Sequence, residues 1–121
     1  MKKGIEKRHL GSWGEERAAE FLRRKGYKVL ERNFRCPAGE VDIVAWEKGV
    51  LVFVEVKTRR GLAYGYPSEA VTPAKRKRLQ RIAEHYIRRR GIGQEIPVRF
   101  DVVSLMVSKE GERLELIKDA F

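Results

Sequence analysis

Residues 39–57 read GEVDIVAWEKGVLVFVEVK, and they predict two neighbouring strands joined by a tight turn. The strands span residues 40–46 and 50–58, and residues 47–49 are short enough to close a hairpin. The second strand is apolar on both faces as far as Val54, which is typical of a central strand covered on two sides. This hairpin therefore predicts the middle of a sheet with helices on both faces.

Acidic side chains interrupt both strands of this hairpin. Side chains alternate along a strand, so Glu55 and Lys57 continue an apolar row. A turn at residues 47–49 places Asp42 nearly opposite Glu55, with Cβ atoms about 5 Å apart. Two carboxylates that close disfavour each other's ionisation, and a hard divalent cation such as Mg²⁺ would relieve the repulsion. The alternative is a charge cluster that is merely tolerated at the end of a sheet.

A first helix is predicted over residues 12–25, ahead of the hairpin. Glu15 lies on the same helical face as the apolar stripe, which would direct this carboxylate toward the sheet. Ser12 and Glu15 also have the spacing of a capping box, so a helix-capping role is the rival interpretation of Glu15.

The remaining segments complete an α/β pattern. Short strands are predicted over residues 27–32, 98–107 and 113–117, with loops over 33–39 and 61–71. Thr72 and Pro73 predict the start of a second helix that ends near Arg90. The order α-β-β-β-α-β-β predicts a three-layer α/β fold with a mixed central sheet flanked by helices. We expect residues 1–10 to form a flexible basic segment and residues 11–121 a single domain.

Charge and composition narrow the function classes. The 121 residues include 27 Lys and Arg against 17 Asp and Glu, a formal charge of +10, which favours a polyanionic partner. The longest uninterrupted apolar run, residues 50–54, is far short of the ~20 residues of a membrane span. The N-terminus lacks the apolar stretch of a signal peptide, and the single cysteine, Cys36, excludes a disulfide within the chain. We therefore expect a cytoplasmic protein without a membrane partner.

Basic and aromatic side chains suggest a surface for nucleic acid. Arg59 and Arg60 follow the central strand, and Tyr64 and Tyr66 in the next loop could stack on a base or sugar. Lys75 begins the apolar stripe of the second helix, where a phosphate contact is predicted. That helix carries eight cations: Lys75, Arg76, Lys77, Arg78, Arg81, Arg88, Arg89 and Arg90. The alternatives are a solvated helix face and loop aromatics that pack on the core.

The pattern Asp42-x12-Glu55-x-Lys57 resembles the signature of the PD-(D/E)XK nuclease superfamily. Six segments resemble the uncharacterised YraN-like bacterial family: GSWGEERAAEFLRRKGY, RNFRC, GEVDIVA, LVFVEVKTR, YGYPSEAVTPAK and VRFDVV. This family is assigned to that superfamily and is similar to archaeal Holliday-junction resolvases. The resemblance runs from about residue 11 to the C-terminus. Val41 stands where the nominal signature has proline, a departure that is ordinary in the resolvase-like branch.

The resemblance implies a restriction-endonuclease-like core and a site for Mg²⁺ or Mn²⁺. By position, the metal-binding acids fall on Asp42 and Glu55, joined by the backbone carbonyl of Val56. Glu15 matches the first-helix glutamate of the related resolvases and would complete the site through a water or a second ion. Lys57 would orient the attacking water or offset charge on the phosphate.

The function expected from these residues is metal-dependent endonucleolytic hydrolysis of DNA, with structured or branched DNA as a candidate substrate. DNA is favoured over RNA. Two alternatives stay open: a nucleic-acid-binding module with little or no cleavage, and a subunit that a partner activates. The oligomeric state is open as well, with a homodimer as one option.

Overall fold

Two helices and five strands form the computed structural model, which describes residues 2–60, 72–93 and 95–121. In chain order they are α1 (Lys2–Arg24), β1 (Lys28–Cys36), β2 (Gly39–Glu47), β3 (Val50–Arg60), α2 (Pro73–Arg90), β4 (Val98–Ser108) and β5 (Gly111–Ile117). The predicted order and the mixed α/β class are confirmed, and the arrangement is consistent with a restriction-endonuclease-like fold. Neither described helix has the length and apolar character that a membrane crossing needs.

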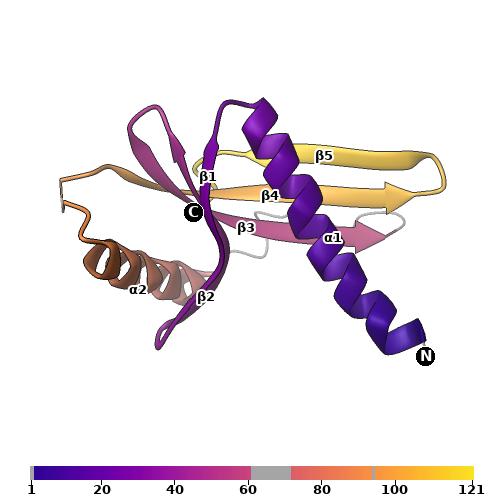
Figure 1. Cartoon of the computed structure of the whole chain (residues 1–121), viewed down its shortest axis with the longest axis horizontal. Coiled ribbons are helices and arrows are strands. Elements are labelled where there is room, and N and C mark those ends of the chain that lie inside the picture. The colour runs from indigo at the N-terminus through magenta and orange to yellow at the C-terminus, as the bar shows by residue number, and fades with distance from the viewer. Residues whose placement is uncertain (1, 61–71, 94) are drawn as a thin grey trace.

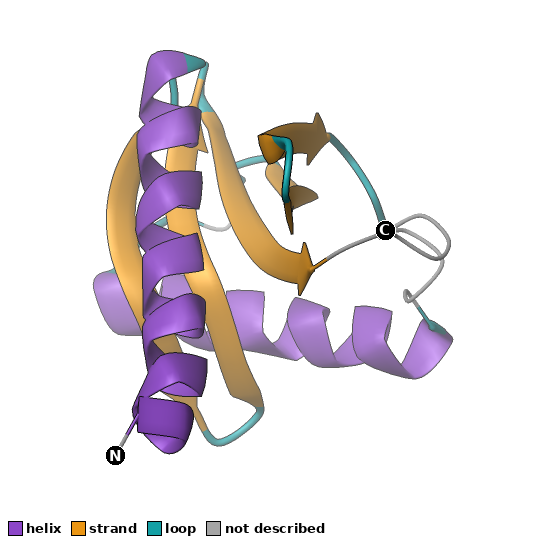
Figure 2. Ribbon diagram, turned by 90° about the vertical axis from the view of Figure 1, so that its right-hand side faces the viewer, coloured by secondary structure: helices purple, strands orange, loops and turns teal. Residues whose placement is uncertain are grey.

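The sheet has the order β1-β2-β3-β4-β5, so β3 lies at its centre. β3 and β4 are parallel and α2 connects them, whereas the other neighbours are antiparallel. Val52 and Val54 of β3 pack in the cluster under α1, and Leu51 and Phe53 pack in the cluster under α2. The two helices therefore cover opposite faces of the sheet, as Figures 1 and 2 show.

The β2–β3 hairpin has the predicted register. Glu47 pairs with Val50, and the two turn residues, Lys48 and Gly49, have φ angles of 49° and 80°. Positive φ at both turn residues is the backbone of a type I′ turn, whose twist matches that of paired strands. This local geometry fixes which residues of β2 and β3 stand opposite each other.

The helix α1 starts ten residues earlier than predicted, at Lys2 instead of Ser12. Ser12 thus lies inside the helix, and the capping-box interpretation of Ser12 and Glu15 is wrong. The early start is physically reasonable because Lys, Glu, Arg and Leu, which dominate residues 2–10, all have good helix propensity. Residues 2–10 therefore form the first turns of α1.

The strand β1 continues through residues 33–36, where a loop was predicted. Asn33 has a φ of 56°, a left-handed conformation that asparagine tolerates better than most residues. The strand can therefore kink at Asn33 without ending. Only Pro37 and Ala38 remain to connect β1 to β2.

β2 and β3 separate at the end of their shared ladder. The last pair joins Ile43 to Val54, although β2 keeps pairing with β1 as far as Gly39. β3 likewise keeps pairing with β4 as far as Arg60. Figure 1 shows the first half of β2 curving away from β3. We call this point the fork; Asp42 and Glu55 are the first residues beyond its last pair.

Candidate active site

Asp42 lies at the fork and breaks the alternation of β2. Its neighbours Val41 and Ile43 belong to core clusters on opposite faces of the sheet, although period-two alternation would put them on one face. The Asp42 carboxylate instead reaches β3, where Oδ2 accepts a 2.7 Å hydrogen bond from the backbone N–H of Val56. Simple alternation therefore fails at Asp42, where the side chain accepts the backbone hydrogen bond of Val56 at the point where the strands part.

The electrostatic surroundings of Asp42 disfavour its ionised form. Burial raises the pKa of Asp42 to about 6, although the hydrogen bond from Val56 works in the other direction. The negative charges of Glu55, Glu15 and Glu40 raise the pKa further. The predicted acids Glu15 and Glu55 are thus both close enough to Asp42 to disfavour its ionised form.

Glu55 and Lys57 approach the fork from the α2 side of the sheet. Glu55 Oε2 lies 3.2 Å from Nζ of Lys75, which belongs to the first turn of α2. The Glu55 and Lys75 side chains are only 17% and 16% exposed. Burial and the neighbouring Lys75 lower the pKa of Lys57, while the charge of Glu55 opposes that shift. Lys75 is therefore a member of this cluster and not a solvated lysine.

Glu15 approaches the fork from α1. This helix packs very closely on β3 at Gly14, where an added Cβ would lie 2.3 Å from Thr58 Oγ1. The close approach brings the next residue, Glu15, near enough to Asp42 to raise its pKa. Glu15 also forms an ion pair with Arg32, 3.6 Å from Nη2. The interpretation of Glu15 that directs it toward the sheet is the one that agrees with this geometry.

The oxygen donors at the fork suit a hard divalent cation in their chemistry. Within residues 2–60, 72–93 and 95–121, however, no group of three or more His, Cys, Asp or Glu side chains is already arranged to hold an ion. Each acid has a protein partner instead: Asp42 has the N–H of Val56, Glu55 has Lys75, and Glu15 has Arg32. A cation at this position would therefore compete with Lys75 for the Glu55 carboxylate.

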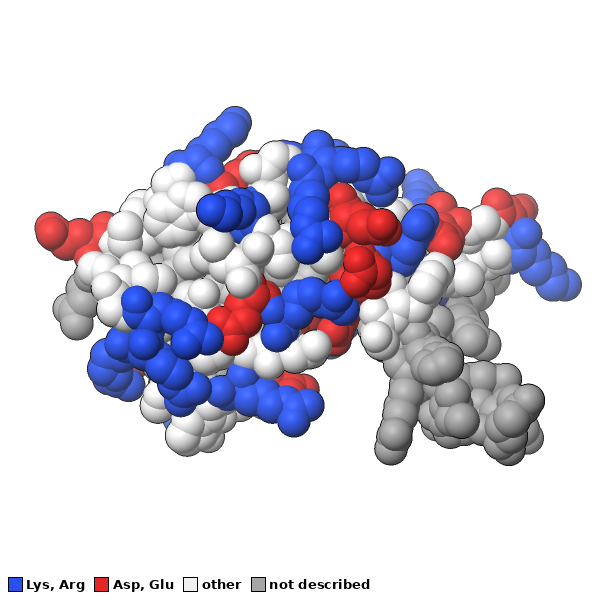
Figure 3. Space-filling view, in the orientation of Figure 1, with Lys and Arg blue, Asp and Glu red and all other residues white. Residues whose placement is uncertain are grey.

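The residues predicted to contact nucleic acid are distributed around this cluster. Arg76, Arg78 and Arg88 are exposed on α2, and Figure 3 shows basic side chains gathered over that helix. Arg89 donates to the carbonyl of Arg35 and lies over the Phe34 ring, whereas Arg59 is partly buried on β3. Tyr64, Tyr66 and the side chain of Arg60 lie outside the residues that the structure describes.

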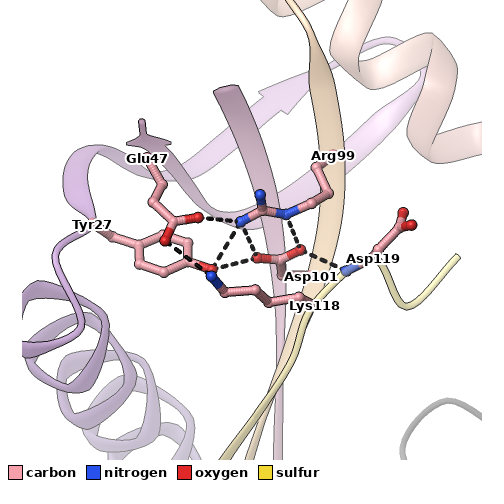
Figure 4. Close-up of polar contacts among 6 residues, drawn as sticks. All are labelled: Tyr27, Glu47, Arg99, Asp101, Lys118 and Asp119. Carbon is pink, nitrogen blue, oxygen red and sulfur yellow. Dashed lines mark hydrogen bonds and ion pairs between the residues drawn. The ribbon is translucent and has the colours of Figure 1, made fainter. Parts of the chain in front are cut away.

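A second polar cluster, which sequence reasoning did not assemble, surrounds Asp101 (Figure 4). Asp101 is fully buried, and Arg99 binds it through Nε at 2.9 Å and binds Glu47 through Nη2 at 2.7 Å. Tyr27 donates to Asp101, and Lys118 pairs with Glu47. Every charge in this cluster is matched, which fits a structural role.

Arg32 is a second residue near the fork that the sequence analysis did not identify as a candidate. Its position opposite Ile43 in the β1–β2 register puts it on the α1 face, where it contacts both Glu15 and Glu16. The signal that could have found it is this register, because Ile43 packs under α1. The register shift between Val29 and Glu31, together with the positive φ of Asn33, hides that register from the pattern of β1 alone.

Known proteins with similar sequences identify the family. Residues 14–105 match the model described as uncharacterised protein family UPF0102. A UPF0102 protein of Caldicellulosiruptor saccharolyticus is 51% identical over 119 residues, 97% of this chain and 100% of the relative. Those of Symbiobacterium thermophilum and Clostridium botulinum are 51% and 44% identical over 94% and 93% of this chain, and over 97% and 93% of their own lengths. The chain therefore belongs to the uncharacterised protein family UPF0102, the YraN-like family that its motifs predicted.

Proposed function

We propose that this protein is a metal-dependent endonuclease of the PD-(D/E)XK superfamily, similar to Holliday-junction resolvases, which hydrolyses phosphodiester bonds in structured or branched DNA. The observation that carries the proposal is the position of Asp42 at the fork near Glu55 and Glu15, whose charges together with burial raise the pKa of Asp42 to about 6. A surface that only binds DNA has no need of carboxylates there, since they repel phosphate. Lys57, two residues beyond Glu55, supplies the positive charge that such chemistry needs.

Asp42, Glu55 and the backbone carbonyl of Val56 would hold Mg²⁺ or Mn²⁺, with Glu15 completing the site. The bound ion supplies polarisation of the phosphodiester and a lowered pKa for a coordinated water. Lys57, on the Glu55 side of β3, orients the attacking water or offsets the charge that develops on the phosphate. The hydrogen bond from Val56 holds the Asp42 carboxylate against β3 and so fixes its direction.

The proposed substrate is DNA in a reducing cytoplasm. The formal charge of +10 and the exposed cations of α2 support binding to a phosphate backbone. These cations belong to the helix whose first turn contacts Glu55 through Lys75, so a duplex that contacts the start of α2 would lie near the fork. DNA is preferred over RNA in this proposal, and branched DNA over linear DNA.

A second candidate function is a DNA-binding module, or a subunit that a partner activates, with little or no cleavage of its own. The observation that favours it is the ion pair between Glu55 and Lys75, which occupies a proposed metal ligand. In this case Glu55 would stay paired with Lys75 until a partner molecule separated the two side chains.

A cleavage assay on linear, nicked, flap and four-way DNA tests the proposal. With Mg²⁺ or Mn²⁺ we expect the wild type to cut the branched substrates, and we expect Lys57→Ala and Asp42→Asn to abolish cutting while DNA binding in chelator persists. Binding without cleavage on all four substrates would favour the second candidate. Equal cleavage by Lys57→Ala would show that the proposed site does not perform the reaction.

A further inference from the structure

Lys75 occupies an unusual position for a cation. It lies in the first turn of α2, where the helix dipole disfavours positive charge and where acidic residues are absent. Its backbone N–H donates to Thr72 Oγ1 at 3.1 Å, and Pro73 begins the helix, so the start of α2 is well defined. The local sequence therefore determines the position of Lys75 in the helix. It does not explain why a lysine occupies that position, but the contacts of its side chain do.

The contact that Lys75 makes is with Glu55, at 3.2 Å between Nζ and Oε2. More than four fifths of each side chain is buried, so solvent screens this pair less than an ion pair on the open surface. The pair joins residues 20 positions apart, across the β3–α2 connection. The pair also occupies one oxygen of Glu55, a proposed cation ligand.

The cluster holds more positive charge than Glu55 can match. Lys57 lies beside both Lys75 and Glu55, so two ammonium groups share one carboxylate. Asp42 also lies near Lys57, and the hydrogen bond from the neutral N–H of Val56 leaves the negative charge of this carboxylate in place. A divalent cation bound by Asp42 and Glu55 would therefore take both carboxylates from the two lysines, and an anionic phosphate oxygen would be a suitable new partner for Lys75.

We propose that Lys75 is an exchangeable counter-ion: it neutralises Glu55 in the metal-free protein, and it moves to a phosphate of the bound DNA when a divalent cation takes Glu55. The proposal rests on the proposed function and adds a positioning residue to it. Lys75 would then couple the two binding events, because the metal frees the lysine and the phosphate keeps it away from Glu55.

Metal affinity without DNA tests the first half of the exchange. The Mn²⁺ dissociation constant is measured by calorimetry for the wild type, Lys75→Met, Lys75→Arg and Lys77→Met. Removing the competitor in Lys75→Met should tighten Mn²⁺ binding about five- to ten-fold. Lys75→Arg keeps the competing charge and should stay near the wild type. Lys77→Met removes the same charge from an exposed side chain of the same helix and should change the constant less than two-fold.

A result in which Lys75→Met binds Mn²⁺ no more tightly than Lys77→Met would overturn the exchange. Weaker binding by Lys75→Met would also overturn it, since Lys75 would then support the metal site structurally. Melting curves in chelator confirm that each variant still unfolds cooperatively.

The salt dependence of DNA affinity tests the second half. With Ca²⁺ in place of Mg²⁺, Lys75→Met should reduce the slope of log affinity against log salt by about 0.9, the value for one phosphate contact. In chelator the same substitution should leave the slope unchanged, because Lys75 is then paired with Glu55. Equal effects in Ca²⁺ and in chelator would contradict the exchange.

Two further variants separate failure of the exchange from failure of the proposed function. If Asp42→Asn and Glu55→Gln abolish Mn²⁺ binding but Lys75→Met does not tighten it, only the exchange is wrong. If Asp42→Asn and Glu55→Gln bind Mn²⁺ as well as the wild type, the proposed metal site is wrong and the exchange falls with it.

Discussion

The charge of Asp42, a residue of the candidate site, is expected to lower the stability of the folded protein. Its carboxylate is largely removed from water and lies near Glu55 and Glu15, so its pKa rises from 3.8 to about 6. The folded protein thus holds the proton of Asp42 more tightly than the unfolded chain does. The stability associated with this proton is complete below about pH 4 and is lost as the pH rises through 6.

Asp42→Asn is therefore expected to stabilise the metal-free protein at pH 7.5 by about 1–3 kcal/mol, since it removes the repelled charge. The asparagine oxygen can still accept the hydrogen bond from Val56. The gain should shrink on acidification toward pH 4.5, because the wild-type carboxyl then becomes protonated in the folded state. Urea unfolding in chelator at the two pH values measures this, with Asp42→Ala as a control that also loses the hydrogen bond.

Added Mn²⁺ should stabilise the wild type and leave Asp42→Asn unaffected, because ligand-linked stability requires binding to the native state. A clear loss of stability for Asp42→Asn in chelator, together with a wild type that does not respond to metal, would contradict the metal site. Asp42 would then be a structural partner of the surrounding lysines.

At the scale of elements, the contact between α1 and β3 positions Glu15. Gly14 is buried against Thr58, and this absence of a side chain lets the helix lie close to the sheet. At the opposite end of the sheet, the hydrogen bonds and ion pairs of Arg99 with Glu47 and Asp101 connect the strands (Figure 4). The two contacts are independent and can be tested separately.

Gly14→Ala is expected to destabilise the protein by about 1–2 kcal/mol, because overpacking costs more than the roughly 1 kcal/mol gained in helix propensity. In a Thr58→Ala background the obstructing Oγ1 is gone, so the same substitution should become neutral or stabilising by up to about 1 kcal/mol. Thermal or urea unfolding of the four proteins measures the coupling. If Gly14→Ala stabilises the protein with Thr58 present, the close approach is not a constraint.

Arg99→Met is expected to cost about 3–5 kcal/mol, since it leaves buried carboxylates without their cation. Burial would raise the pKa of Glu47, but its hydrogen bonds with Arg99 and Lys118 prevail and lower it. Glu47 therefore contributes stability above pH 4.5 that is lost on acidification, and the deficit of Arg99→Met should narrow toward pH 4. Arg113→Met, an exposed arginine of β5, serves as the control and should change stability by less than about 0.5 kcal/mol.

At the scale of the whole molecule, positive charge is present on both helices. α2 exposes Arg76, Arg78 and Arg88 and pairs with Glu55 through Lys75 in its first turn, whereas Arg23 and Arg24 end α1, which covers the other face of the sheet. Net charge alone would make all of these cations equivalent in DNA binding. If DNA binds along α2 as proposed, the cations of α2 contribute more to DNA affinity than those of α1.

The double reversal Arg76→Glu/Arg88→Glu should weaken duplex DNA binding and reduce the salt slope by about 1.8, as expected for two lost phosphate contacts. The matched reversal Arg23→Glu/Arg24→Glu changes the net charge equally but should have a much smaller effect. Fluorescence anisotropy over a range of salt concentrations measures both. Equal losses for the two variants, or an affinity that does not depend on salt, would show that α2 is not the recognition surface.

Local signals in the sequence were sufficient for most of the fold. The apolar run of β3 predicted the central strand, and the short link at residues 47–49 predicted the hairpin and its register. Thr72 and Pro73 predicted the start of α2 in the same way. These features depend on neighbours within a few residues, where propensity and periodicity decide the conformation. Two predicted boundaries were wrong: the start of α1 at Ser12 and the end of β1 before Asn33. At both places, residues that favour a boundary lie within a longer helix or strand.

The contacts of the candidate site could be found only from the tertiary structure. They join residues that are far apart in the chain, and no helical or strand periodicity relates such residues. The sequence alone identified Asp42, Glu55, Lys57 and Glu15 as candidates. It could not show that the strands part at Asp42, or that Glu55 pairs with Lys75. Those facts depend on how two helices pack on opposite faces of one sheet, and on the low screening of charges that this packing buries.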